Sequence, residues 1–352
     1  MKKLLLIALL CCLMPFCASA ETTITCDVNG QPAAQAALIK KQLSVLSGDK
    51  KVLIENSFLT GDERAKLRKQ FPDLTLSFCD TLESVRVKEN DERVDFAGVQ
   101  AIDPAQIRRL IAAHPTLKAV DLYDAHMKTS DQLALFDEYP GIEFGFTIRF
   151  AEHVVRSDVT AFSTLHSKRS EPHTSQQLSA LRMCRHLRAL DIGHNIADDI
   201  SWLRSLPELR ILIIALNRIE DISPLSSLTH LEYLEMFNNY IKDISPLTNC
   251  KELLDLNIGF NCIGDISPLY ELPKLQRLWM YSFRVRNADS TTPEMRQTLR
   301  ERLPHCTFEF THYPTLEGWR EHPRYFTMYD IFQTRVYRPW DAQPPTTEEK
   351  QK

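Results

Sequence analysis

Apolar and polar positions recur with a period of 22 through the middle of the chain. Windows beginning at His186, Glu208, His230 and Glu252 superpose without a gap. Three columns of this alignment hold leucine at Leu187, Leu209, Leu231, Leu253 and Leu275, asparagine at Asn195, Asn217, Asn239 and Asn261, and aspartate before Ile-Ser at Asp199, Asp221, Asp243 and Asp265. Self-similarity of this kind indicates a stack of equivalent units, each too small to fold alone.

Each period predicts one short strand and one compact segment that returns the chain to the next strand. Apolar residues are predicted to point inward from both sides of the turn, as do Leu187, Leu190, Ile192, Ile200, Leu203 and Leu206 in the first one. The column asparagine follows the strand, where its amide can pair backbone groups that would otherwise be buried without partners. Pro224, Pro246 and Pro268 suit the start of the returning segment, because their φ is fixed and no N–H is needed there. The column aspartate is predicted to cap this turn rather than to bind calcium.

The pattern L-x-x-L-x-I-x-x-N-x-I-x-D-I-S-P-L-x-x-L resembles the leucine-rich repeats of the internalin type. The resemblance implies a curved parallel β-sheet on the concave face of a solenoid, with short helices or 3₁₀ turns on the convex face. We therefore predict an α/β leucine-rich-repeat solenoid with terminal caps. The runs FGFTIRFAEHVVRSDVTAFSTL from Phe144 and GWREHPRYF from Gly318 also resemble a group of exported bacterial leucine-rich-repeat proteins. That likeness supports the fold and implies nothing about a substrate.

The flanks repeat the alternation of strand and helix over longer turns. The segment from Lys51 aligns with the segment from Ala119 at a constant offset of 68 positions, and each copy predicts strand, helix, proline and strand. The two predicted helices span residues 61–70 and 130–138. We expect one continuous solenoid over residues 51–310, with a loop at 163–177.

The ends of the array are expected to be closed by caps, because an open turn exposes core and strand edge. Phe283 replaces the column asparagine, so the regular repeats are predicted to stop there. A helix is predicted from Thr292, as N-cap, through about Arg302, and the aromatic segment 317–332 is expected to fold over the last turn. The predicted divisions are a signal peptide at residues 1–20, an N-terminal cap with longer turns at 21–170, regular repeats at 171–283, a C-terminal cap at 284–341 and a disordered tail at 342–352.

The first twenty residues predict a secretory signal peptide. A positively charged start precedes an apolar run at residues 4–16, and small residues at 18–20 suit signal peptidase. The run is too short for a stable membrane span. We therefore expect a secreted, extracellular or cell-surface protein whose mature chain begins at Glu21. The alternatives are a buried N-terminal helix or a lipid anchor on Cys11, Cys12 or Cys17.

Charge and cysteines narrow the classes of partner. Loss of Lys2 and Lys3 with the signal changes the formal charge from −4 to −6, and a mildly acidic chain with interspersed charges argues against nucleic acid as partner. An even number of remaining cysteines suggests disulfides, yet Cys184 and Cys250 fall in leucine slots and are predicted to be buried thiols. No CxxC motif occurs, so neither a zinc site nor another metal or cofactor is predicted. We expect a monomer.

Outward-facing strand residues form the predicted binding surface. Adjacent strands lie ~4.8 Å apart, so these residues make a contiguous patch on the concave face. The patch is apolar and aromatic with a few acids, and exposed aromatic clusters are typical of recognition surfaces. The predicted ligand-binding residues are Tyr233, Glu235, Phe237, Asp255, Asn257, Phe260, Arg277, Trp279 and Tyr281. The alternative is a C-terminal cap that covers part of the patch, Trp279 and Tyr281 above all.

These features favour a non-enzymatic module that binds a protein ligand through the concave face. Glycan binding through the same patch is the first alternative, because Trp and Tyr rings stack on sugar rings. An uncharacterised hydrolase is the second, and it would require a deep pocket with paired titratable groups. No catalytic residue is predicted, because no nucleophile motif includes His114, His194, His305, His312 or Cys262.

Overall fold

The computed structural model describes residues 21–27, 32–166, 171–283 and 290–341. The predicted signal peptide at 1–20 and the predicted tail at 342–352 lie outside the described residues. The chain divides into two compact units, one made of Met1–Phe96 with Ile102–Val120 and the other of Ala97–Ala101 with Asp121–Lys352. None of the helices in the described part of the chain is long and apolar enough to cross a membrane.

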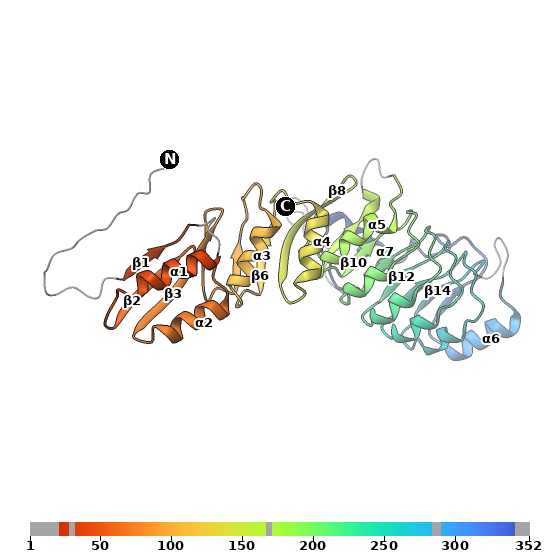
Figure 1. Ribbon diagram of the computed structural model, residues 1–352. Coiled ribbons are helices and arrows are strands. Elements are labelled where there is room, and N and C mark those ends of the chain that lie inside the picture. The colour runs from red at the N-terminus through yellow and green to blue at the C-terminus, as the bar shows by residue number, and fades with distance from the viewer. Residues whose placement is uncertain (1–20, 28–31, 167–170, 284–289, 342–352) are drawn as a thin grey trace. The chain divides into compact units, whose positions relative to one another are not determined.

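The first unit is built around a small sheet (Figure 1). Its elements are β1 (Thr22–Thr25), α1 (Pro32–Leu43), β2 (Lys50–Glu55), α2 (Gly61–Gln70), β3 (Leu74–Leu82) and β4 (Val85–Lys88), followed by β5 (Arg93–Asp95) and α3 (Pro104–Ala113) before β6 (Ala119–Leu122) begins. The sheet order is β1-β2-β3-β4, parallel except for the antiparallel β3–β4 hairpin. The predicted helix at 61–70 is confirmed, and its N-cap is Thr60, which forms a capping box with Glu63.

A buried ionic group holds this unit together. Asp80 accepts hydrogen bonds from Arg64 Nη2 at 2.8 Å and from the backbone N–H of Phe58 at 2.9 Å, and His114 Nε2 lies 2.9 Å from the same carboxylate. Arg64, Asp80 and His114 are all at most 1% exposed. Charges so deeply buried require partners of this kind.

The second unit carries the regular repeats. After α4 (Thr129–Glu138), the hairpin β7 (Glu143–Phe150) and β8 (His153–Arg156) precedes the seven-stranded parallel sheet. Its strands are β9 (Ala161–Ser163), β10 (Ala189–Asp191), β11 (Ile211–Ile213), β12 (Tyr233–Glu235), β13 (Asp255–Asn257), β14 (Arg277–Trp279) and β15 (Thr307–Glu309), paired in that order. Between β9 and β10 lie η1 (Thr164–His166), α5 (Ser175–Leu178) and η2 (Ser179–Met183).

The predicted period of 22 is confirmed in strands, returning segments and side chains. Strands β10 to β14 begin at that spacing, and so do the 3₁₀ helices η3 (Ser201–Ser205), η4 (Ser223–Ser227), η5 (Ser245–Asn249) and η6 (Ser267–Glu271). Asn217 shows the role of the asparagine column: its Nδ2 donates to Ile192 O of the preceding turn at 2.9 Å, and its Oδ1 accepts from Ala197 N at 2.9 Å. The aspartate column caps each 3₁₀ segment, as Asp221 Oδ1 accepts from Ser223 N at 2.7 Å.

The longer turns also repeat as predicted, although they do not continue the same sheet. Helices α2 and α4 begin 68 positions apart, and so do strands β4 and β8. However, the strands form three separate sheets, β1 to β4, β5 to β8 and β9 to β15. The prediction of one continuous solenoid over residues 51–310 is therefore wrong, because hairpins end the parallel pairing at β4 and at β8.

The C-terminal segment takes a path that the sequence analysis did not predict. Helix α6 (Pro293–Arg302), with Thr292 as N-cap, confirms the predicted helix, and β15 pairs with β14 at the end of the sheet. The chain then turns back across the concave face, and α7 (Pro323–Thr334) lies against β9 and β10. The prediction that residues 317–332 fold over the last turn is wrong, since they cover the concave strands instead.

The cysteines match the prediction of thiols. Cys184 and Cys250 are fully buried and form no disulfide, and the same absence of disulfides holds for the other cysteines of the described residues. Burial raises the pKa of Cys250 to about 12 and that of Cys184 further. Both therefore act as small apolar residues in leucine positions.

Candidate functional site

The predicted ligand-binding residues lie beneath the chain's own C-terminal segment. Exposed fractions are between 0 and 9% for Tyr233, Glu235, Phe237, Asp255, Asn257, Phe260, Arg277 and Trp279, and Tyr281 is half-buried. The structure thus contradicts the prediction that these side chains form an exposed patch. The predicted alternative of a covering cap describes the arrangement better, and the cap extends well beyond Trp279 and Tyr281.

Polar contacts hold the C-terminal segment against the strands. Trp319 Nε1 donates to Glu235 Oε1 at 2.8 Å, and Asn257 Nδ2 donates to Pro314 O at 2.7 Å. Trp279 Nε1 donates to Leu316 O at 3.1 Å. The residues expected to contact a separate ligand therefore bind this segment instead.

A buried ionic group lies at the centre of this interface. Arg277 Nε donates to Asp255 at 2.7 Å, and Arg324 on α7 donates to both oxygens of the same carboxylate at 2.6 and 2.7 Å. Burial opposes ionisation of Asp255, but the hydrogen bonds from the two arginines outweigh it, so the pKa of Asp255 is lowered. The Arg277 guanidinium also lies 4.6 Å from the centre of the Trp319 ring.

Aromatic side chains also pack between the strands and the C-terminal segment. The Tyr233 ring lies 5.5 Å from that of Trp319, and its hydroxyl donates to Glu235. Tyr313 packs against both Phe260 and Phe237, with ring centres 5.3 and 6.5 Å apart. These separations are typical of aromatic pairs in a protein core.

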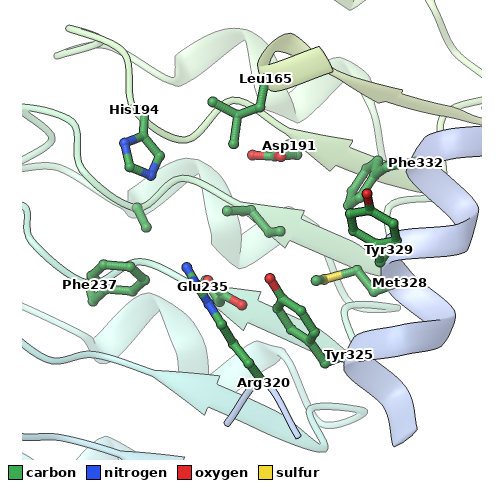
Figure 2. A pocket seen from close by; sticks show the side chains of 12 residues that line it. Leu165, Asp191, His194, Glu235, Phe237, Arg320, Tyr325, Met328, Tyr329 and Phe332 are labelled. Atoms are coloured by element: carbon green, nitrogen blue, oxygen red, sulfur yellow. The ribbon is translucent and has the colours of Figure 1, made fainter. Parts of the chain in front are cut away.

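Besides a wider cavity of about 530 Å³ beside Arg277, Trp279 and Arg324, a smaller cavity lies open between β10–β12 and α7 (Figure 2). It has a volume of about 150 Å³ and is lined by Leu165, Asp191, His194, Ile213, Ala215, Glu235, Phe237, Arg320, Tyr325, Met328, Tyr329 and Phe332. Asp191 on β10 and Glu235 on β12 both pair with Ile213 on the strand between them. Their backbones are thus separated by two strand spacings, about 10 Å.

The cavity contains two buried acids, with basic side chains at more exposed positions. Burial raises the pKa of Asp191 to about 6, although Gly193 N and Ser163 Oγ donate to it at 2.9 and 2.8 Å. Burial also raises the pKa of Glu235. Arg320 and His194 are exposed as whole residues. Partial desolvation of the His194 ring, together with the charge of Arg320, lowers the pKa of that histidine.

Sequence reasoning missed this cavity and one further group of residues. The outward position of Asp191 and His194 follows from the repeat, but the wall formed by Tyr325 and Tyr329 depends on the path of α7. Away from this wall, Glu152, His153 and His173 bring potential metal-ligating atoms together, although no metal site was predicted. The asparagine column could have indicated the position of His173. Asn195 belongs to that column and accepts a hydrogen bond from His173 N, so His173 occupies the position that apolar residues hold in the next turns.

Comparisons with known proteins support the repeat assignment. Residues 207–249 match the family model described as leucine-rich repeats in two copies. No curated protein has a sequence that matches this chain.

Three solved structures illustrate the likeness of fold. An internalin C2 from Listeria monocytogenes is 24% identical, with 62% of this chain and 80% of that chain covered and a TM-score of 0.31. A leucine-rich-repeat protein from Leptospira interrogans is 18% identical, with 74% and 72% covered and a TM-score of 0.38. A second internalin from Listeria monocytogenes is 20% identical, with 63% and 62% covered and a TM-score of 0.28. The match of residues 207–249 to leucine-rich repeats agrees with the period of 22 residues observed from β10 to β14.

Proposed function

We propose that this chain is a secreted or cell-surface, non-enzymatic binding module that recognises a protein ligand. The proposed recognition site is the cavity between β10–β12 and α7, together with the outer face of α7. One observation carries the proposal: the concave face is covered by the chain's own C-terminal segment, while a cavity beside this segment stays open next to the exposed Tyr329. The covered residues then serve to position α7.

The size of the cavity favours a side chain of a protein over the alternatives. A volume of about 150 Å³ suits a group the size of a benzene ring. Pockets for small-molecule ligands are usually ≈ 300–1,000 Å³. An oligosaccharide or the substrate of a hydrolase would need more room than this cavity provides, although the cavity beside Arg277 and Trp279 is larger, at about 530 Å³. In addition, Glu235 already accepts bonds from Tyr233 and Trp319, which makes it a poor general base.

The outer face of α7 provides the second part of the proposed site. Phe326 is 61% exposed and Tyr329 is 54% exposed. They are three residues apart, so they lie on the same side of the helix, and Tyr329 also lines the cavity. Exposed aromatic side chains beside a pocket are typical anchors of protein recognition.

The buried acids favour a basic side chain as the inserted group. Asp191 is deeply buried, and its raised pKa reflects an ionised form that has too little compensating charge. A lysine or arginine of the ligand would supply that charge and hydrogen-bond donors as well. Arg320 competes electrostatically, but its exposed side chain can rotate towards solvent when a ligand enters.

A display library of random peptides on the mature chain tests this proposal. We expect enrichment of peptides with a lysine or arginine beside apolar residues. The affinity of a selected synthetic peptide should fall about tenfold or more in Asp191→Asn and in the Phe326→Ala/Tyr329→Ala double variant. Tyr240→Ala is the matched control, because Tyr240 is exposed but does not line the cavity. Peptides that bind all these variants equally, or binding on a glycan array instead, would refute the proposed site.

Export is the part of the proposal that depends on residues 1–20. It is supported by the sequence pattern and by β1, which begins at Thr22 and pairs with β2 immediately after the proposed cleavage position. Intact mass analysis of the exported protein should give an N-terminus at Glu21. Retention of residues 1–20, or a lipid on a signal cysteine, would contradict it.

A further inference from the structure

Two buried histidines face each other beside a carboxylate in the second unit. His153 Nε2 and His173 Nε2 are 3.0 Å apart. Oε1 of Glu152 lies 3.5 Å from the first nitrogen and 3.7 Å from the second. Among the described residues, three potential ligand atoms from two separate parts of the chain thus converge on one point.

These separations are those of ligand atoms around a metal ion. In tetrahedral zinc sites, bonds of about 2.0–2.2 Å to nitrogen and oxygen place neighbouring ligand atoms about 3.3–3.5 Å apart. Distances of 3.0, 3.5 and 3.7 Å allow an ion to lie about 2.0–2.1 Å from all three atoms, slightly out of their plane. Side chains would need to shift by only a few tenths of an ångström.

The surroundings suit an imidazole site with access from solvent. His153 and His173 are 7% and 1% exposed. Rings of Phe150 and Phe162 pack around them, with Phe150 5.2 Å and Phe162 5.5 Å from the ring of His153. Metal ions bind the neutral form of an imidazole. Glu152 is exposed and leaves a path for an ion and for a water ligand.

The repeat itself does not require a histidine at position 173. Asn195 Oδ1 accepts from His173 N at 2.7 Å, in the way that Asn217 Oδ1 accepts from Ala197 N and Asn239 Oδ1 from Ile219 N. His173 therefore occupies a position that holds apolar residues in the next turns. A side chain smaller or more apolar than imidazole would satisfy the fold there.

The β7–β8 hairpin, which carries Glu152 and His153, also differs in sequence from the equivalent β3–β4 hairpin. At the same offset of 68 positions, Val85 corresponds to His153 and Ser84 to Glu152. The equivalent hairpin between β3 and β4 therefore forms without histidine or glutamate at these positions. Folding of the hairpin does not explain why these two residue types are found together in the second copy.

We propose that Glu152, His153 and His173 bind a divalent transition-metal ion, Zn²⁺ above all. The two Nε2 atoms and the carboxylate are the ligands, and water occupies the fourth position. Imidazole favours zinc, copper or nickel over magnesium and calcium. The bound ion would join the β7–β8 hairpin to His173, in the segment before the N-cap of α5, and so fix the first turn of the repeat sheet. The charge of Arg335 acts on His153 and opposes a cation, while the carboxylate of Glu152 offsets it.

A simple hydrogen bond between the two imidazoles is the competing explanation. One neutral ring would donate to the other, and no ion would be required. The two explanations differ in what metal addition does. A hydrogen-bonded pair has no affinity for zinc beyond that of surface histidines.

Calorimetric titration of ZnCl₂ into the metal-free mature chain, without a polyhistidine tag, tests the proposal. We expect one equivalent of Zn²⁺ to bind, a rise in Tm on addition, and the visible absorption of tetrahedral Co²⁺ when CoCl₂ is used instead. MgCl₂ and CaCl₂ should have no such effect. His153→Ala and His173→Ala should each weaken binding at least a hundredfold, whereas His230→Ala, which changes an exposed histidine elsewhere in the unit, should leave it unchanged.

Glu152→Gln keeps the test decisive if a histidine variant fails to fold. Glu152 is exposed, so its substitution should leave the circular dichroism spectrum intact. Its zinc affinity should fall about tenfold or more, because a ligand is lost. The proposal is overturned if the wild-type chain takes up no zinc, if Glu152→Gln binds zinc as tightly as the wild type, or if the folded His153→Ala/His173→Ala double variant retains the site.

Discussion

In strands β10 to β14, some side chains point into the solenoid and others point towards the concave face. Both sets are buried, but they differ in composition. The inward position holds leucine in every strand, at Leu190, Leu212, Leu234, Leu256 and Leu278, each 0% exposed. The outward positions before and after it hold Ala189 and Asp191, Ile211 and Ile213, Tyr233 and Glu235, Asp255 and Asn257, and Arg277 and Trp279. All ten of these outward residues are buried as well.

This difference in composition reflects what the inward row and the outward row of strand side chains contact. An inward leucine contacts the same leucines one turn before and one turn after, so a repeating environment selects a repeating residue. An outward residue contacts the C-terminal segment, which crosses the strands once and presents a different group to each. Asp255 contacts Arg324, Glu235 contacts Trp319, and Gly259 lets Pro314 approach so closely that an added Cβ would lie 2.7 Å from Pro314 Cγ. An irregular outward row is thus evidence of a partner within the chain.

Truncation of Trp319 tests most strongly whether the outward row is part of the core. Trp319 is 0% exposed and contacts Tyr233, Trp279 and Glu235. We expect Trp319→Ala to lower the free energy of unfolding by about 4 kcal/mol, which is as large as the cost of Leu234→Ala at about 2–5 kcal/mol. Urea unfolding followed by tryptophan fluorescence measures both, because every tryptophan of the chain belongs to the second unit. If Trp319→Ala alone costs no more than a typical surface substitution, the segment contributes little to the fold.

Removal of Asp255 compares the buried ionic group of the concave face with an ion pair on the surface. Asp255→Ala leaves Arg277 and Arg324 without their common carboxylate, and breaking a buried pair in this way costs about 3 kcal/mol. Glu252→Ala, which removes a surface pair with Lys274, should cost less than about 1 kcal/mol. The same urea titration measures both variants. Equal small effects would show that the ionic group does not fasten α7 to the strands.

The pH dependence of stability should distinguish the cavity from the covered part of the face. Burial raises the pKa of Asp191 from 3.8 to about 6, so the folded chain binds this proton more tightly than the unfolded chain does. The stability linked to that proton is fully present below about pH 4 and is lost as the pH rises through about 6, on the order of 2–3 kcal/mol. Asp191→Asn should remove this loss. The measurement is the difference in unfolding free energy between wild type and variant at pH 4 and pH 7.5. A difference that does not change with pH would place Asp191 in a polar environment.

Repeating contacts could be predicted from the sequence, and non-repeating contacts could not. The repeat period determined the strands, the 3₁₀ segments and both capping columns, and local capping signals placed the helices at 61–70 and 293–302. The path of residues 310–341 follows from one-time contacts such as Arg324 with Asp255, which leave no periodic signal. The position of His173 beside His153 likewise depends on a contact that does not repeat along the chain. The segment 163–177 lacks the leucines of a regular turn and was predicted to be a loop, although Asn195 continues the asparagine column into it.

Substitutions on the outer face of α7 should have the smallest effect on stability among these variants. They should weaken ligand binding while leaving the free energy of unfolding nearly unchanged. Phe326 and Tyr329 are more than half exposed, whereas Met328 and Phe332 on the same helix are buried against the strands. Surface substitutions usually change stability within about ±0.5 kcal/mol, so Phe326→Ala/Tyr329→Ala should unfold at nearly the same urea concentration as the wild type. Met328→Ala should lose about 2–5 kcal/mol, because it leaves a cavity behind the helix. If the exposed pair destabilises as much as Met328→Ala does, the two aromatic residues are needed for packing, and the outer face of α7 is no longer a candidate for ligand recognition.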